Sequence, residues 1–190
     1  LFRSERYVSR AGLKLAGAAE AFNLDFRGKT VLDVGSSTGG FTDFALQHDA
    51  KKVYAVDVGT DQLHPSLRGN KRIELYEKTD IRDFVPSETP DMVVIDVSFI
   101  SLRQILPHVA KIVDKNTTIV AMVKPQFEAQ RQQLTRGGVV KNDGVRRAIL
   151  REFEQWARAN FIIINKADSE VKGAYGNLER FYILRKAGSC

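Results

Sequence analysis

The sequence has one cysteine, Cys190, and no run of apolar residues as long as a membrane crossing requires. A lone cysteine cannot form an internal disulfide or build a structural zinc site. A membrane-spanning helix needs about 20 consecutive apolar residues, and the first residues do not resemble a secretory signal peptide. These absences argue against disulfide-rich, zinc-dependent and membrane-spanning proteins. We expect a cytoplasmic protein that binds no metal and no membrane.

The charge balance is the first positive indication. The chain has 190 residues, of which 43% are hydrophobic, enough for one globular domain with a buried core. Lysine and arginine number 29 against 23 aspartates and glutamates, a formal net charge of +6. This balance favours polyanions such as RNA, although charge alone does not distinguish RNA-binding proteins from other basic proteins. Because the chain begins with Leu1 rather than methionine, we expect a fragment of a longer protein, with residues 1–190 forming one domain.

Hydrophobic periodicity predicts helices that alternate with short buried strands. Ser9 is a plausible N-cap for a first helix, whose apolar residues recur at helical spacing. The expected helices cover residues 7–22, 41–46, 102–113 and 143–160. The expected strands cover residues 30–34, 53–56, 73–76, 92–95, 118–123, 161–165 and 178–184. This alternation predicts an α/β fold with a mostly parallel sheet. Residues 125–142 form the longest irregular stretch, and such loops in compact domains are usually functional.

A glycine-rich turn, from Gly35 to Gly39, separates the first strand from the next helix. The turn lacks the glycine spacing of dinucleotide-binding folds and the Gly-Lys-Ser/Thr ending of nucleotide-phosphate loops. Asp33, inside the strand, would repel a pyrophosphate. It would suit a ligand with an ammonium and a sulfonium group, and S-adenosylmethionine has both. The turn therefore favours S-adenosylmethionine over the common phosphate-bearing cofactors.

Two further aspartates follow the second and third strands. Asp57 comes 24 residues after Asp33, where a carboxylate can accept hydrogen bonds from ribose hydroxyls. Asp80 could accept one from an adenine amino group. Each aspartate taken alone is better explained as a turn or cap residue. The ordered set of three, together with the glycine turn, favours a cofactor site.

A second group of ionisable residues follows the fourth and fifth strands. Asp96 and Lys124 are expected at neighbouring strand ends, the edge where open α/β sheets place their active sites. A partly desolvated lysine beside a carboxylate can help a hydroxyl lose its proton. Lys14, on the first helix, and Glu179, near the last strand, are further candidates. The alternatives are a solvated helix lysine for Lys14 and an edge-strand charge for Glu179.

Basic residues of the first helix, the long loop and the helix after it are candidate RNA-phosphate contacts. A loop this rich in arginine could instead be merely solvated. The candidates are Arg10, Arg131, Arg136, Lys141, Arg146 and Arg147.

Three strings of residues identify a known family. They are Ser-Thr-Gly-Gly-Phe at 37–41, Asp-Val-Ser-Phe-Ile-Ser-Leu at 96–102 and Lys-Pro-Gln-Phe-Glu at 124–128. With Ser-Arg-Ala-Gly-Leu-Lys at 9–14 and Gly-Asn-Leu-Glu at 176–179, the chain resembles, over nearly its full length, the TlyA type of ribosomal RNA 2′-O-methyltransferase. That type belongs to the FtsJ-like group and was historically labelled hemolysin A.

The resemblance implies a Rossmann-like methyltransferase fold, with a seven-stranded sheet whose last strand is antiparallel, and S-adenosylmethionine as cofactor. It also implies a catalytic tetrad of Lys14, Asp96, Lys124 and Glu179. In that scheme Lys124 assists deprotonation of the 2′-hydroxyl, Asp96 and Glu179 hold and tune it, and Lys14 orients the ribose or stabilises the oxyanion. The residues implied or inferred to bind the cofactor are Asp33, Gly35, Ser37, Gly39, Phe41, Asp57, Asp80 and Asp96.

Two departures from the family pattern bear on function. Members usually have an N-terminal RNA-binding domain, and nothing precedes Leu1 here, so we expect impaired affinity for the ribosomal RNA or ribosomal-subunit partner and impaired choice of substrate. We also expect a Ser-Pro where this chain has Ser169-Glu170, and the placement of Glu179 depends on that loop.

Three alternatives remain open at this stage. They are a non-catalytic module for RNA binding or ribosome assembly, a membrane-lytic hemolysin, and methylation of a base or a small molecule. The string Asp96-Val-Ser-Phe differs from the Asn-Pro-Pro-Tyr type typical of base-directed enzymes. The target nucleotide, the ribosomal subunit and the oligomeric state are not indicated by the sequence.

Overall fold

The computed structural model describes residues 6–188, so Cys190 lies outside the described residues. The strands are β1 (Thr30–Val34), β2 (Lys52–Val56), β3 (Ile73–Tyr76), β4 (Met92–Ile95), β5 (Thr118–Val123), β6 (Phe161–Asp168) and β7 (Arg180–Lys186). The helices are α1 (Arg10–Phe22), α2 (Gly40–Gln47), α3 (Leu102–Ile112), α4 (Pro125–Glu128) and α5 (Asp143–Ala157).

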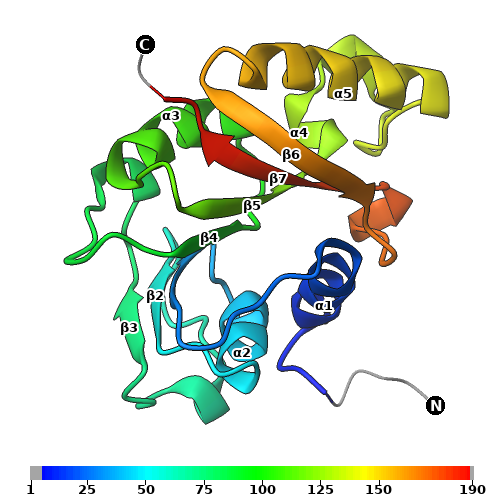
Figure 1. Cartoon of the computed structure of the whole chain (residues 1–190). Coiled ribbons are helices and arrows are strands. Elements are labelled where there is room, and N and C mark those ends of the chain that lie inside the picture. The colour runs from blue at the N-terminus through cyan, green and yellow to red at the C-terminus, as the bar shows by residue number, and fades with distance from the viewer. Residues whose placement is uncertain (1–5, 189–190) are drawn as a thin grey trace.

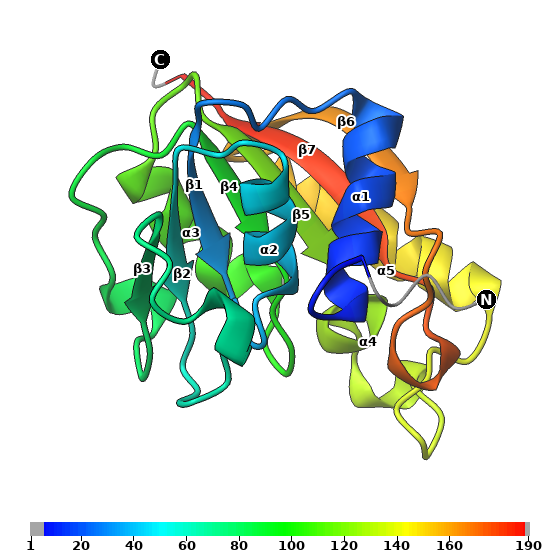
Figure 2. The same ribbon diagram turned by 90° about the horizontal axis from the view of Figure 1, so that it is seen from below.

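The seven strands form one sheet in the order β3-β2-β1-β4-β5-β7-β6. Strand β7 is antiparallel to both of its neighbours, while the other adjacent pairs run parallel. Figures 1 and 2 show α1 and α2 on one face of the sheet and α3 and α5 on the other. The predicted α/β fold with a seven-stranded, mostly parallel sheet and an antiparallel last strand is confirmed.

Strand β1 shows why the apolar runs of the sequence become central strands. All five of its residues are buried. Val31 packs into the core under α1 and α2, whereas Leu32 packs into the core under α3 and α5. Because successive side chains of a strand point to opposite faces, a strand covered on both faces is mostly apolar; the exceptions in β1 are Thr30 and Asp33.

The last two strands differ from the predicted boundaries. Strand β6 extends to Asp168, and β7 begins at Arg180 rather than at 178. The pairing between them shifts at Ile163 and Asn165, where β6 bulges. Strand β6 lies at the sheet edge and exposes Ile162 and Ile164, each 53% accessible, so its side chains do not follow a simple buried pattern.

The stretch 125–142 is more ordered than predicted. It begins with the short helix α4, continues with a 3-10 turn at Arg131–Gln133, and closes with a bridge between Leu134 and Val140. Helix α5 ends at Ala157, three residues earlier than predicted. No helix within residues 6–188 combines the length and the apolarity of a membrane span.

Candidate active site

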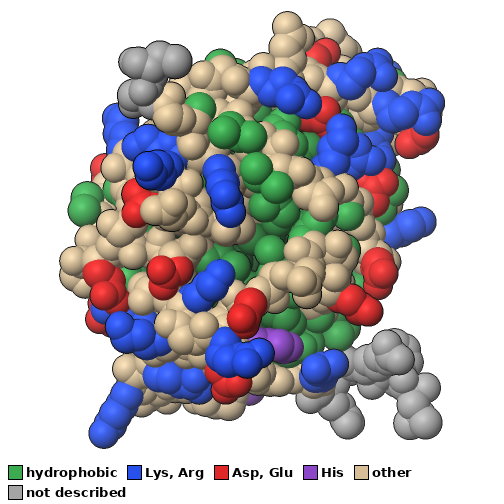
Figure 3. Space-filling model, viewed as in Figure 1, with side chains coloured by type: hydrophobic (Ala, Val, Ile, Leu, Met, Phe, Trp, Pro, Cys, Tyr) green, Lys and Arg blue, Asp and Glu red, His purple; other side chains and the backbone are tan. Residues whose placement is uncertain are grey.

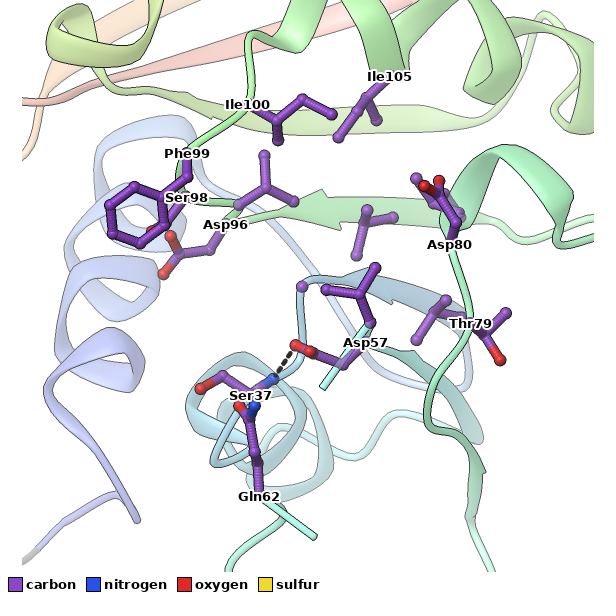
Figure 4. A pocket seen from close by; sticks show the side chains of 16 residues that line it. Ser37, Asp57, Gln62, Thr79, Asp80, Asp96, Ser98, Phe99, Ile100 and Ile105 are labelled. Carbon is purple, nitrogen blue, oxygen red and sulfur yellow. Dashed lines mark hydrogen bonds between the residues drawn. The ribbon is translucent and has the colours of Figure 1, made fainter. Parts of the chain in front are cut away.

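A cavity of about 360 Å³ opens at the carboxyl ends of β1, β2 and β4, a size in the range of small-molecule sites. Figure 4 shows Ser37, Asp57 and Asp96 around it, with Asp80 at one side and Ile100 and Ile105 forming an apolar wall. A second cavity, of about 460 Å³, extends from the glycine turn to the start of α1 and to Lys124. Both cavities share Gly35, Ser37, Asp96 and Ser98.

The turn after β1 requires glycine at position 35. Gly35 has φ +80°, and a Cβ there would lie 2.5 Å from the carbonyl oxygen of Asp96. The N–H groups of Gly35 and Ser36 both donate to the carbonyl of Val56, at 2.9 and 3.2 Å. The absence of a side chain therefore lets the turn approach the ends of β2 and β4 closely.

Asp57 is held rigidly at the end of β2. One of its carboxylate oxygens accepts from the N–H of Ser37 and the other from the N–H of Gly59, each at 2.7 Å. Figure 4 shows the first of these bonds across the cavity floor. Because each carboxylate oxygen can accept more than one hydrogen bond, the group can still accept from a ligand's hydroxyls.

Asp80 lines the same cavity and is kept ionised by a neighbour. The side chain of Arg82 donates to both oxygens of Asp80, at 2.9 and 2.6 Å, and these bonds lower the pKa of Asp80 to about 2. The Asp80 carboxylate is therefore a hydrogen-bond acceptor at all physiological pH values, although Arg82 already donates to both of its oxygens.

Asp33 does not line either cavity, which corrects its interpretation as a direct ligand contact. Its side chain is 1% exposed and accepts from the hydroxyl of Thr42 at 2.6 Å. Burial raises the pKa of Asp33 to about 7. Asp33 lies behind the glycine turn and anchors α2 there. Gly39, at φ +93°, also lies outside both linings, whereas Phe41 lines the second cavity.

The four residues of the predicted tetrad form two ion pairs. Lys124 Nζ lies 2.7 Å from Asp96 Oδ1 and donates to Ser98 Oγ at 2.8 Å. Lys14 Nζ lies 2.5 Å from Glu179 Oε2. Glu179 is 2% exposed and Lys14 11%, so neither is the solvated charge that the alternatives described. Glu179 holds Lys14 and not Lys124, a correction to its implied role.

Strand register explains why the two pairs are neighbours. In the antiparallel pairing of β5 with β7, Val123 lies opposite Arg180. Lys124 directly follows Val123 and Glu179 directly precedes Arg180. Both residues therefore lie where the carboxyl end of β5 meets the start of β7. The site therefore depends on β7 inserting beside β5.

The sequence reasoning missed three residues that support the site. Ser98 accepts from Lys124, as described above. Glu128 is buried and accepts from the hydroxyl of Ser101 at 2.6 Å and from the N–H of Leu102 at 2.7 Å, which ties α4 to the start of α3. Phe99 is 90% exposed at φ +64°, and its ring centroid lies 5.1 Å from that of Phe127. All three lie in the family strings, which were the available signal.

The predicted RNA contacts separate into two groups. Arg146 is 7% exposed, forms an ion pair with Asp168 and donates to the carbonyl of Leu178 at 2.9 Å. It is a structural residue, and we remove it from the RNA contacts. Arg147 is exposed and pairs with Asp143. Figure 3 shows other lysine and arginine side chains over α5. The remaining candidates are exposed: Arg10, Arg131, Arg136 and Lys141.

No group of three or more metal-ligating side chains gathers within residues 6–188.

Comparisons with known proteins identify a family and several relatives of the chain. The sequence model of the FtsJ-like methyltransferases matches residues 7–187. Hemolysin A of Brachyspira hyodysenteriae is 42% identical over 179 residues, which cover 92% of this chain and 75% of that protein. The 23S rRNA (cytidine-2′-O)-methyltransferase TlyA of Campylobacter jejuni is 42% identical over 188 residues, which cover 96% of this chain and 72% of that protein.

Solved structures agree with the sequence comparisons. A structure from Streptococcus thermophilus that is described as a hemolysin superposes with a TM-score of 0.92 at 43% identity. The superposition covers 97% of this chain and 68% of that one. The likeness therefore extends over nearly all of the elements that form the site.

Proposed function

The chain belongs to the FtsJ-like methyltransferase family, and from this premise we propose that it transfers the methyl group of S-adenosylmethionine to a ribose 2′-hydroxyl of ribosomal RNA. The observation that carries the proposal is the ion pair of Lys124 with Asp96 at the carboxyl edge of the sheet, where both residues line the cavity beside the glycine turn. The buried pair of Lys14 with Glu179 lines neither cavity and stands next to this site through the register of β5 with β7.

The residues around the cavities fit S-adenosylmethionine. Asp57 offers carboxylate oxygens to ribose hydroxyls, and Asp80 offers an ionised acceptor beside the apolar wall where an adenine ring would lie. The hydroxyls of Ser9 and Ser36 are buried without a hydrogen-bond partner among residues 6–188, and both residues line the second cavity. The start of α1 has no acidic residue in its first turn and no side-chain cap, and the positive end of a helix dipole favours a carboxylate there.

These features assign an orientation to the cofactor. Its adenosine would occupy the first cavity, and its amino-acid end would reach the glycine turn and the second cavity. When bound, S-adenosylmethionine supplies an electrophilic methyl group on a sulfonium. The shared wall of the two cavities includes Asp96 and Ser98, so the methyl group would face Lys124.

The lysines supply what the hydroxyl requires. An alcohol is a weak nucleophile at neutral pH and needs help to lose its proton. Asp96 and Ser98 fix the Lys124 amino group in one position. As the neutral amine it accepts the hydroxyl proton, and the ammonium so formed stabilises the charge that develops on the oxygen. Glu179 fixes Lys14 in the same way, and Lys14 orients the ribose.

The decisive experiment incubates the protein with labelled S-adenosylmethionine and purified bacterial ribosomal subunits, and then maps the label on the RNA. We expect label on a ribose 2′-oxygen. Label on a base, or none, would contradict the proposal, and binding of subunits without transfer would favour a non-catalytic module. Because one relative is named a hemolysin, the same preparation is tested for leakage of dye-loaded liposomes, and we expect none.

A further inference from the structure

Three consecutive residues before β7 are held by three different parts of the fold. The side chain of Asn177 bonds to the 125–142 segment, and the carbonyl of Leu178 accepts from Arg146 of α5 at 2.9 Å. Glu179 pairs with Lys14 of α1. The position of the Glu179 carboxylate is therefore set by contacts on both of its preceding neighbours.

The side chain of Asn177 hydrogen-bonds to the backbone of the 125–142 segment as a neighbouring strand would. It is 5% exposed, its Oδ1 accepts from the N–H of Val140 at 3.1 Å, and its Nδ2 donates to the carbonyl of Gly138 at 3.4 Å. Its own carbonyl accepts from the N–H of Gly173 at 2.9 Å, which closes the turn that precedes Glu179. An amide can both donate and accept, so a carboxylate or a methyl group at this position would lose part of the connection.

The partner of Asn177 is a small hairpin, residues 131–141, which we call the basic hairpin. It is closed by the bridge between Leu134 and Val140, and the N–H of Thr135 donates to the carbonyl of Val139 at 2.8 Å. Figure 2 shows it (yellow-green) projecting from the body next to the turn before β7 (orange-red). Its exposed cations are Arg131, Arg136 and Lys141.

We propose that Asn177 is a positioning residue that connects RNA contacts on the basic hairpin to the placement of Glu179, and through Glu179 to Lys14. The inference rests on the proposed function, because it takes RNA as the ligand of the hairpin. The hairpin carries exposed cations and also gives backbone groups to the Asn177 side chain. RNA phosphates that fix the hairpin therefore also fix the turn that ends in Glu179.

The connection is separable from the stability of the fold. Arg146, which pairs with Asp168, donates to the Leu178 carbonyl from α5 and not from the hairpin, so the loss of the Asn177 side chain leaves this anchor of the turn in place. We therefore expect Asn177→Ala to fold and to bind S-adenosylmethionine as the wild type does.

The test compares Asn177→Ala, Asn177→Asp and the control Asn165→Ala, which removes an exposed amide on β6. With ribosomal subunits as substrate, Asn177→Ala should lower kcat about tenfold or more, since small misplacements of a reacting group cost up to about 100-fold. Asn177→Asp keeps the acceptor for Val140 but cannot donate to Gly138 when ionised, so it should fall between Asn177→Ala and the wild type. The control should retain wild-type kcat.

Hydrogen exchange provides a readout that a merely structural residue would not alter. In the wild type, added subunits should slow amide exchange in both residues 131–141 and residues 169–180. In Asn177→Ala only the hairpin should be slowed. Wild-type kcat in Asn177→Ala, or slowed exchange at 169–180 in that variant, would overturn the proposal.

Two other outcomes are also decisive. A melting temperature and S-adenosylmethionine affinity that fall with kcat in both Asn177 variants would make Asn177 a structural residue and overturn its positioning role. If the wild type transfers no methyl group, the proposed function fails, and the exchange pattern alone then decides whether the hairpin and the Glu179 turn are connected.

Discussion

Lys14 Nζ lies 2.5 Å from Glu179 Oε2, although 165 positions of sequence separate the two residues. One belongs to a helix that packs on the sheet and the other to the turn before its last inserted strand. The pair is almost completely buried. Burial of a charge is tolerated only when a partner neutralises it, so the two residues are interdependent.

We predict that Glu179→Gln and Lys14→Met each destabilise the fold by roughly 3 kcal/mol, because each leaves one buried charge without its partner. The double variant should be less unstable than the sum of the two. Urea denaturation measures this, with Lys166→Met as the control. Lys166 pairs with Glu154 at a more exposed site, where the expected cost is below about 1 kcal/mol. Additive losses in the double variant would show that Lys14 and Glu179 do not depend on each other.

Lys124→Ala should abolish methyl transfer while subunit binding stays intact. The expected loss in kcat is about 100-fold or more, the range for removal of a group that assists proton transfer. Lys124→Arg should fail as well, because a guanidinium does not give up its proton and is larger and planar. Lys115→Ala, which removes an exposed lysine before β5, is the matched control. Activity that survives Lys124→Ala would refute the assignment of this residue.

The two groups of arginines should respond differently to substitution. Arg136→Ala should weaken RNA binding and reduce the slope of log affinity against log salt by about 1, with no change in stability. Arg146→Ala should destabilise the fold by about 2 kcal/mol, the scale for hydrogen bonds to charged groups, with the salt slope unchanged. Binding titrations at several salt concentrations and thermal melts measure both effects. A stable Arg146→Ala with a reduced salt slope would restore Arg146 to the RNA contacts.

Asp33 should make stability fall as the pH rises. Its folded pKa, about 7, lies above the usual value of 3.8, so the folded state holds the proton more tightly. The stabilising contribution is complete below about pH 4 and is lost as the pH rises to about 7. At about 1.4 kcal/mol per pKa unit, ionisation costs the fold roughly 4 kcal/mol at pH 8.

Asp33→Asn removes this ionisation and keeps an acceptor for Thr42. Relative to the wild type, the variant should therefore gain stability between pH 5 and pH 8 in urea denaturation. Asp25→Asn, at an exposed turn, should show no such gain. If the free energy of unfolding changed with pH in the same way for Asp33→Asn and the wild type, the pKa of Asp33 in the folded state would be the ordinary one.

The sequence predicted the centre of the sheet better than its edge. β1, β4 and β5 are covered on both faces, so apart from Thr30, Asp33 and Thr118 their residues are apolar and the strands are visible as nearly continuous runs. In β6 and β7 the pairing continues into polar residues such as Asn165 and Asp168, and no local pattern announces a strand there. The start of β7 was expected two residues early because Leu178 is apolar, but its carbonyl accepts from Arg146 instead of joining the strand ladder.

The sequence predicted most of the residues that form the site but only some of the contacts between them. Asp96 and Lys124 could be placed together because both end neighbouring parallel strands. The partner of Glu179 could not be predicted from local pattern, since Lys14 reaches it only through the packing of α1. Arg146 was misjudged because it stands beside the exposed Arg147, while Asp168, which neutralises it, comes 22 residues later.

The late position of Glu179 also sets a time order for the making of the protein. Lys14 is synthesised 165 residues before its partner, an interval of roughly 8 to 33 s at about 5–20 residues per second. During that interval the growing chain has its glycine turn but no carboxylate to neutralise Lys14. The ion pair of Lys14 with Glu179 forms only when β7 takes its place between β5 and β6. The pair of Lys14 with Glu179 is therefore complete only after nearly the whole of residues 1–190 has been synthesised.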